Sequence, residues 1–266
     1  MNDCLLQELK ASVNNPDLPI LETMQQFTLD AITASGNNSM TDAQKWALNH
    51  FFYQIGAIGN TGPYAKLQVI GMPFIGSSLE TALNNYKAGG AAYSNIRSSI
   101  SFADGKITTS NASGRLLCDY AITGKDDKIF SLVAGDDVLL TNAGQNRSYK
   151  TALTSVKLNL TPSPKTTYTS ALSYNLTQPA TVGAYNVNAS PNGWLGTATE
   201  TTEFTPSTIH LDELLGEDLN LCTPGLGSSD ASMYGFIYGS SLTNEEAGLV
   251  ASALRELLFN FITPSV

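Results

Sequence analysis

The 266-residue chain has few charged side chains, and most of them are acidic. Asp, Glu, Lys and Arg make up 14% of the residues, against about a quarter in an average soluble protein. The net charge at pH 7 is −9. Because nucleic-acid binding depends on clustered Lys and Arg, this balance argues against nucleic acid as a partner. The basic residues, among them Lys125, Lys128, Arg147, Lys150 and Lys157, are scattered singly, which is typical of solvated strand or loop positions.

Histidine, cysteine and long apolar runs are also scarce. His50 and His210 are the only histidines, which leaves little material for a Ser–His–Asp triad or a histidine-rich metal site. Cys4, Cys118 and Cys222 are far apart without a C-x-x-C spacing, so we expect folding in a reducing compartment, with a bridge between Cys118 and Cys222 left open. No membrane span and no signal peptide are predicted, because the first residues lack basic and apolar regions and no 18-residue apolar run occurs.

Residues 1–62 are predicted to form a helical segment. Apolar residues recur at helical spacing over 3–13 and again from Pro19 to Gly36, where glycine provides a stop. Thr41 and Gln44 form a capping box that predicts a third helix of about four turns starting near Thr41. The glycines between Gly56 and Gly62 end it.

Residues 63–266 are predicted to form a mainly β domain. Short alternating segments are separated by Gly, Asn, Asp or Pro, and Asp104-Gly105 is typical of a tight hairpin turn. A second capping box, Thr243 and Glu246, predicts a closing amphipathic helix over 243–262. This pattern favours an antiparallel sandwich. The predicted strands cover 66–70, 99–102, 106–109, 116–121, 129–134, 138–141, 149–153, 156–160, 168–172, 181–187, 194–199, 207–211 and 234–239.

The order of these features resembles the concanavalin/laminin-G-like (jelly-roll) sandwich proteins among bacteriophage virion components. The resemblance covers about residues 41–262. It is carried by "PFIG", "LNNYKAG", "SISFADGKITTSNASG" and the closing "FIYGSSLTNEEAGLVASALRELLFNFI". The matching residues are structural, so the resemblance implies no activity.

What the resemblance implies is a structural role in the particle. The chain would be a capsid decoration, head-fibre or tail-associated protein, assembled in the host cytoplasm and located in the virion. Its partners would be other virion proteins, and residues 1–62 would serve attachment or oligomerisation. Low charge and an apolar N-terminal segment favour a homo-oligomer, with a trimer as our expectation.

Sites for enzymatic chemistry are not evident in the sequence. Glycosidases on this type of sandwich place their carboxylates as E-x-D-x-E or E-x-D-x-x-E, and neither spacing occurs. The carboxylates Asp212, Glu213, Glu217 and Asp218 lie in a Leu-rich stretch that is typical of a solvated helical turn. We therefore expect a non-enzymatic protein.

Two binding sites are considered. Aromatic rings beside amides suit a sugar, because a pyranose stacks on the ring while the amides bind its hydroxyls. The candidate residues for a host-surface glycan are Tyr174, Tyr185, Asn188, Asn192 and Trp194. Packing of these aromatic residues in the core or a subunit contact is the alternative.

Calcium is the one cofactor considered, through oxygen ligands from Asp136, Asp137 and Asn142. An ordinary aspartate-containing turn is the alternative at this position. Two other functions for the whole protein stay open, a soluble lectin-like carbohydrate-binding module and a polysaccharide-degrading enzyme.

Overall fold

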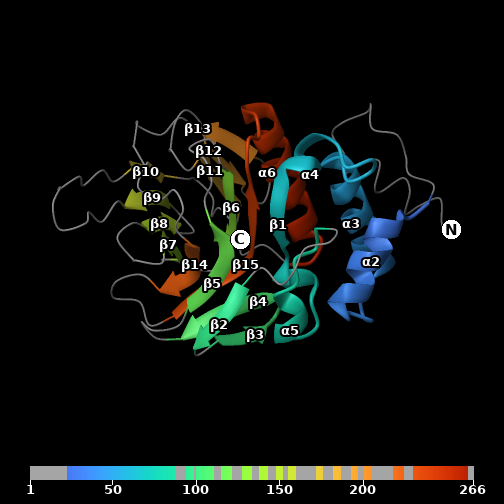
Figure 1. Cartoon of the computed structure of the whole chain (residues 1–266), viewed down its shortest axis with the longest axis horizontal. Coiled ribbons are helices and arrows are strands. Elements are labelled where there is room, and N and C mark those ends of the chain that lie inside the picture. Colours follow the sequence, from blue (N-terminus) through green and yellow to red (C-terminus); the bar gives the residue numbers. More distant parts are fainter. Residues whose placement is uncertain are drawn as a thin grey trace.

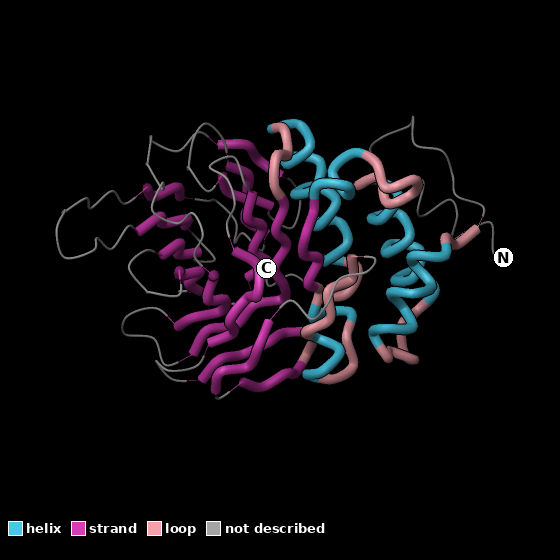
Figure 2. The backbone as a smooth tube through the Cα atoms, in the orientation of Figure 1, coloured by secondary structure: helices cyan, strands magenta, loops and turns pink. Residues whose placement is uncertain are grey.

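Two antiparallel sheets and a layer of helices make up the computed structural model of the chain (Figure 1). The structure describes residues 23–87, 94–98, 100–110, 115–121, 128–133, 138–142, 148–151, 155–159, 172–175, 182–186, 193–196, 201–204, 218–224 and 230–262. Figure 2 shows the helices gathered at one end of the molecule and the strands filling the rest. The prediction of antiparallel strands preceded and followed by helices is confirmed.

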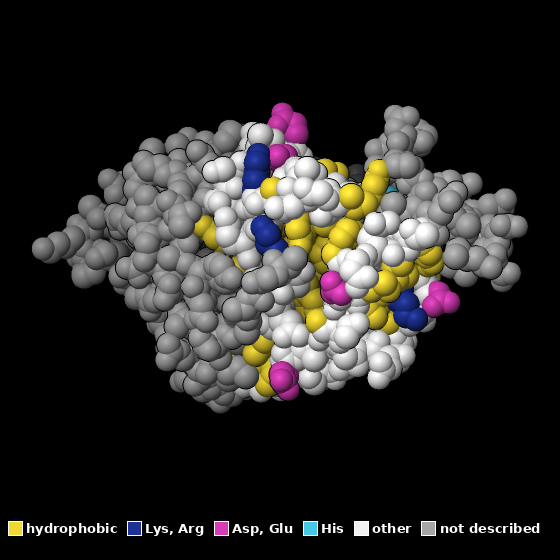
Figure 3. All heavy atoms as spheres, turned by 45° about the vertical axis from the view of Figure 1, so that its right-hand side comes forward, with side chains coloured by type: hydrophobic (Ala, Val, Ile, Leu, Met, Phe, Trp, Pro, Cys, Tyr) yellow, Lys and Arg dark blue, Asp and Glu magenta, His cyan; other side chains and the backbone are white. Residues whose placement is uncertain are grey.

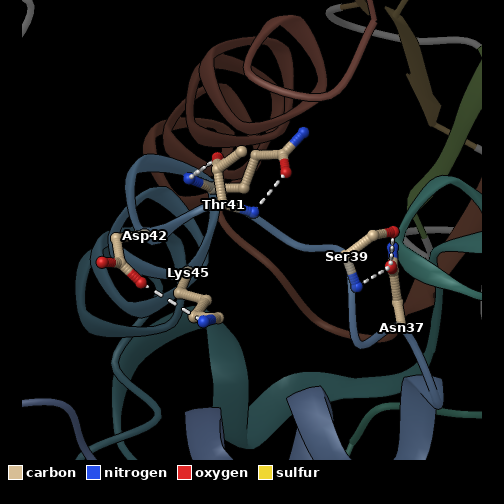
Figure 4. A network of polar contacts seen from close by, with 6 residues as sticks. Asn37, Ser39, Thr41, Asp42 and Lys45 are labelled. Atoms are coloured by element: carbon tan, nitrogen blue, oxygen red, sulfur yellow. Dashed lines mark hydrogen bonds and ion pairs between the residues drawn. The ribbon is translucent and has the colours of Figure 1, made fainter.

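The helices begin and end largely where local signals predict. They are α2 (Gln26–Ser35), α3 (Asp42–Gln54), α4 (Gly62–Lys66), α5 (Leu79–Ala82) and α6 (Asn244–Phe259), with a 3₁₀ turn at Pro73–Ile75. Both capping boxes are formed, and Figure 4 shows the one at Thr41 beside the Asp42–Lys45 ion pair and the Asn37–Ser39 turn. Gly36 ends α2 in the left-handed region, with φ 62°.

One predicted helix begins later in the structure than expected, and another lies outside the described residues. The helix expected to begin at Pro19 begins at Gln26, because residues 23–25 are not helical and the extended Gln25 backbone N–H donates to Asn49 on α3. The helix expected over 3–13 lies outside the described residues.

Sheet A contains eight strands, and β15 is its centre. Antiparallel pairing runs in the order β13 (Thr201–Phe204), β12 (Gly193–Gly196), β11 (Val182–Asn186), β6 (Lys128–Val133), β15 (Asp230–Gly239), β4 (Lys106–Ser110) and β3 (Ile100–Ala103). The second half of β15 also pairs with β1 (Leu67–Gly71). The predicted hairpin turn is confirmed, since Asp104 and Gly105 have φ of 52° and 70° between β3 and β4.

Sheet B contains seven strands and lies against sheet A. Its order is β10 (Leu172–Asn175), β9 (Ser155–Asn159), β8 (Ser148–Thr151), β7 (Val138–Asn142), β14 (Asp218–Pro224), β5 (Arg115–Ala121) and β2 (Ser94–Ser98). Strand β14 lies beside β15 and β4 of sheet A, which fixes how the two sheets stack.

Three strands were not predicted, and one was misplaced. The missed strands are β2, β13 and β14, and the structure corrects the helical interpretation of Asp218, which begins β14. Strand β10 begins at Leu172, where the predicted strand over 168–172 ends. The predicted strand over 207–211 lies outside the described residues.

One hydrophobic core joins the helical layer to sheet A. Leu48 and Phe51 of α3, with Ile55 directly after it, are at most 1% exposed and belong to one cluster with Leu254 and Leu257 of α6. From the sheet, Ile70, Ile237 and Phe130 belong to the same cluster and are fully buried. The core therefore contains residues from both sides of residue 62, the predicted domain boundary.

Polar contacts also join the helices to the strands. The Lys66 ammonium pairs with Glu246 at 2.7 Å, so the end of α4 is held at the start of α6. The Lys87 ammonium donates to the backbone carbonyls of Tyr64 (2.9 Å) and Leu67, where α4 passes into β1. No helix in the described ranges is long and apolar enough to cross a membrane.

Candidate functional site

The strand register of sheet B separates an apolar from a polar set of positions. Residues opposite one another in neighbouring strands share a face, and the face alternates along each strand. One cross-strand row contains Leu172, Leu158, Tyr149 and Leu140. The next row on that face contains Tyr174, Val156, Thr151, Val138 and Pro224. Such apolar rows gain free energy by burial, so this is the face expected to pack on sheet A.

The alternate positions of sheet B form what we call the polar face. Its first row is Asn159, Ser148, Thr141, Asn220, Leu117 and Asn95. Its second row is Ser173, Lys157, Lys150, Leu139 and Thr223. The helical layer lies on the far side of sheet A from sheet B (Figure 1), so among the described elements none lies over this face. Amides and hydroxyls dominate it, and they both donate and accept hydrogen bonds.

Two of the predicted glycan residues, Tyr185 and Trp194, lie in paired strands of sheet A. Trp194 lies in a cross-strand row with Ala184, Phe130, Ile237 and Ile70. The last three are buried in the core shared with the helices, and α6 passes beside β11, β12 and β13. Tyr185 follows Ala184 and therefore occupies the opposite face of sheet A. The register thus places these two aromatic residues at positions of opposite face in sheet A.

Of the remaining glycan candidates, only Tyr174 lies within the described residues. Tyr174 lies in sheet B, in the apolar row opposite Val156, and is separated from Tyr185 by the stacking of the two sheets. Asn188 and Asn192 lie outside the described residues. What sequence reasoning missed is the polar face, although "SVKLN" over 155–159 alternates polar and apolar residues as a half-buried strand does.

The calcium prediction is not tested. Asn142 is the last residue of β7 and pairs with Leu219, whereas Asp136 and Asp137 lie outside the described residues. In the part of the chain that the structure describes, no three His, Cys, Asp or Glu side chains converge on a metal position.

The bridge left open between two cysteines is opposed by the register. Cys118 pairs with Leu219, three residues before Cys222 in β14. At about 3.3 Å per residue along the strand and about 5 Å between strands, the two Cα atoms are roughly 11 Å apart, whereas a disulfide needs about 4.4–6.8 Å.

His50 lies on α3 at the edge of the core. Burial lowers its pKa below the ordinary value, and its Nε2 atom is buried without a hydrogen-bond partner in the described structure. His210, Asp212, Glu213 and Glu217 lie outside the described residues.

The surface of the helical layer is the other candidate contact region. Figure 3 shows hydrophobic side chains spread across this end of the molecule, with isolated acidic and basic groups between them. Three large hydrophobic residues are about 40% exposed, namely Leu29 (41%), Ile58 (41%) and Leu249 (40%). They come from α2, the loop after α3, and α6.

No protein-family model matches the chain, and no curated protein is similar to it. Among solved structures, similarity is found to domain 4 of AbnA, a GH43 extracellular arabinanase from Geobacillus stearothermophilus, in complex with arabinotriose. The TM-score is 0.44 and the identity 12%, over 70% of this chain and 98% of that one.

Two further structures show comparable or weaker similarity. The binding domain of botulinum neurotoxin DC, in complex with rat synaptotagmin II, gives a TM-score of 0.44 at 8% identity, over 74% of this chain and 52% of that one. A lectin from Bauhinia forficata in complex with GalNAc gives 0.33 at 9% identity, over 59% of this chain and 96% of that one.

Proposed function

We propose that the protein is a non-enzymatic structural component of a bacteriophage particle that displays a glycan-binding sandwich. In this proposal the two sheets form a concanavalin/laminin-G-like jelly roll, and the polar face of sheet B binds a host-surface glycan. The observation that carries the glycan-binding part is the row of amide and hydroxyl positions that the register of sheet B aligns across neighbouring strands.

The chemistry of the polar face suits a sugar. Asn220, Thr141, Ser148 and Asn159 occupy one row across four neighbouring strands. Neighbouring strands are about 5 Å apart, and successive positions on one face are about 7 Å apart along a strand. This is the scale of single sugar rings, so a row of amides and hydroxyls can bind the hydroxyl groups of consecutive residues in a glycan.

The helical layer supports attachment to the particle. Its exposed Leu29, Ile58 and Leu249 suit contact with another protein, because apolar side chains and sparse charge are typical of subunit interfaces. A trimer attached through this end would direct three polar faces outward. The three weak interactions would then act together.

The glycan-binding part is tested with the full chain on a glycan array. The double substitution Asn220→Ala/Thr141→Ala removes the centre of the polar row and should reduce binding about tenfold or more, since each hydrogen bond contributes about 1 kcal/mol. The matched control is Asn38→Ala/Thr33→Ala, at exposed positions of the helical layer, and it should bind as the unchanged protein does. Equal binding by both variants would remove the polar face as the site.

The structural part is tested on particles. Stable co-purification with virions, retained after high-salt washing, is the expected result, and a protein found only in the soluble fraction would favour the lectin-like module. Release of reducing ends from a host polysaccharide, at a rate proportional to protein concentration, would contradict the non-enzymatic assignment.

A further inference from the structure

Two lysines that are seven residues apart in the sequence lie directly opposite each other in sheet B. Lys150 of β8 pairs with Lys157 of β9 in the antiparallel register, within the second row of the polar face. Ser173 lies beyond Lys157 in that row, and Leu139 lies beyond Lys150. The scattered appearance of these lysines in the sequence is therefore misleading, because the strand pairing places them together.

Two positive charges at paired positions lower the stability of the sheet. Like charges at directly opposite positions of two antiparallel strands destabilise the pairing. The described strands around the pair, β7 and β10, contain no acidic residue that could offset the repulsion. The acidic residues of the described sheet B strands are Asp119 in β5 and Asp218 at the start of β14, two or three strands away from Lys150.

The charge balance of this sheet also differs from that of the chain. Its described strands contain four basic residues, Arg97, Arg115, Lys150 and Lys157, and two acidic ones. The whole chain has 14 basic and 23 acidic residues. The paired positions of Lys150 and Lys157 therefore place two positive charges side by side in an acidic chain.

We propose that the Lys150–Lys157 pair binds the acidic group of an anionic glycan, and that the neighbouring amides and hydroxyls bind the sugar hydroxyls. This inference rests on the proposed glycan-binding function and narrows its ligand class. An anion bound at these two register positions would offset the repulsion between their positive charges. Ser148 and Asn159 lie two residues from the lysines on the same face, which places them about 7 Å away, within reach of the same or the next sugar ring.

The test measures binding of the full chain to three polymers. Alginate supplies carboxylates, dextran sulfate supplies sulfates, and unmodified dextran supplies neither. The unchanged protein should bind an anionic polymer at least about tenfold more tightly than dextran, with affinity falling as sodium chloride rises. The preference between alginate and dextran sulfate identifies the acidic group.

Two lysine variants and a matched control assign the binding to the pair. Lys150→Gln/Lys157→Gln should weaken binding of the anionic polymer about tenfold or more, whereas Lys150→Arg/Lys157→Arg should retain most of it. The control Lys45→Gln/Lys106→Gln removes the same charge from α3 and β4 and should have little effect. Circular dichroism measures whether each variant is folded. If the Gln variant is not folded, the retained binding of the Arg variant and the salt dependence of binding test the proposal instead.

The possible negative results distinguish failure of this inference from failure of the proposed function. Binding of neutral glycans on the array with no preference for alginate or dextran sulfate would overturn the anionic ligand while leaving the proposed function intact. Equal weakening by the Gln variant and its control would also overturn the assignment to this pair. Absence of binding to any glycan would overturn both proposals.

Discussion

At the scale of single residues, His50 makes stability depend on pH. Because burial lowers its pKa in the folded protein, the unfolded chain binds more protons than the native state as the pH falls through the ordinary value of 6.5. The free energy of unfolding should therefore decrease from pH 7.5 to pH 5.5. His50→Gln should make that decrease smaller, because Gln does not titrate.

The measurement is urea unfolding of both proteins at the two pH values. Glu256, whose pKa is raised by burial, contributes in the opposite direction but equally in both proteins, so it cancels in the comparison. Asn38→Ala, which changes no titrating group, is the control. An unchanged pH dependence in His50→Gln would show that this imidazole does not contribute.

Nearness in the sequence does not determine which face of a sheet a residue occupies. Tyr185 and Trp194 are only nine residues apart, yet the β11–β12 register places them on opposite faces of a sheet. A shift of one position reverses the face of every residue in a strand. The register depends on long-range pairing, which composition and spacing do not determine. The same reasoning explains why Lys150 and Lys157 looked unrelated.

At the scale of elements, local signals predicted helix starts well. The hydroxyl of Thr243 accepts from the Glu246 backbone N–H at 3.2 Å, and the Glu246 carboxylate accepts from the Thr243 N–H at 2.7 Å. Both interactions lie within four consecutive residues, so the sequence contains all that determines them. Strand β14, in contrast, was not predicted from local signals. Its ladder shifts register between Asn220 and Thr223, and such an irregularity obscures the alternation by which strands are recognised.

Two substitutions at the start of α6 measure separately how much its N-cap and its ion pair with Lys66 contribute to stability. Thr243→Ala should lower the free energy of unfolding by about 1 kcal/mol, because an orphan N–H of the first turn loses its acceptor. Glu246→Gln keeps an acceptor for the Thr243 N–H but loses the charge pairing with Lys66, a half-exposed pair that should cost less than about 1 kcal/mol. Chemical denaturation of the two variants checks this order. The reverse order would mean that Lys66, rather than the cap, holds this end of the helix.

At the scale of the whole molecule, the helical layer and sheet A depend on one core. Phe52 is fully buried and its ring lies 5.4 Å from that of Phe27 and 6.4 Å from that of Tyr64, so it joins α2, α3 and α4. The sequence predicted the helices of residues 1–62 but treated them as an attached segment. Which surface they cover could not be predicted, because it depends on Ile70, Phe130 and Ile237 meeting in neighbouring strands.

A fragment of residues 63–266 tests whether the helices are separable. We expect it to lack a cooperative unfolding transition, because removal of Leu48, Phe51 and Ile55 uncovers α6 and one face of sheet A. Truncating even one large core side chain typically costs about 2–5 kcal/mol. Thermal unfolding followed by circular dichroism, with the full chain as the control, is the measurement. A fragment that melts at the same temperature as the full chain would make residues 1–62 an independent attachment segment.

The central place of β15 has a consequence for synthesis of the protein. Residues 230–239 pair with β1, β4 and β6, all of which leave the ribosome long before them. At about 5–20 residues per second, roughly ten to thirty seconds separate β1 from the strand that completes its pairing. During that delay three strands present open edges to other nascent chains. Yield in recombinant expression should therefore respond to temperature and to chaperone supply more than the stability of the finished protein would indicate.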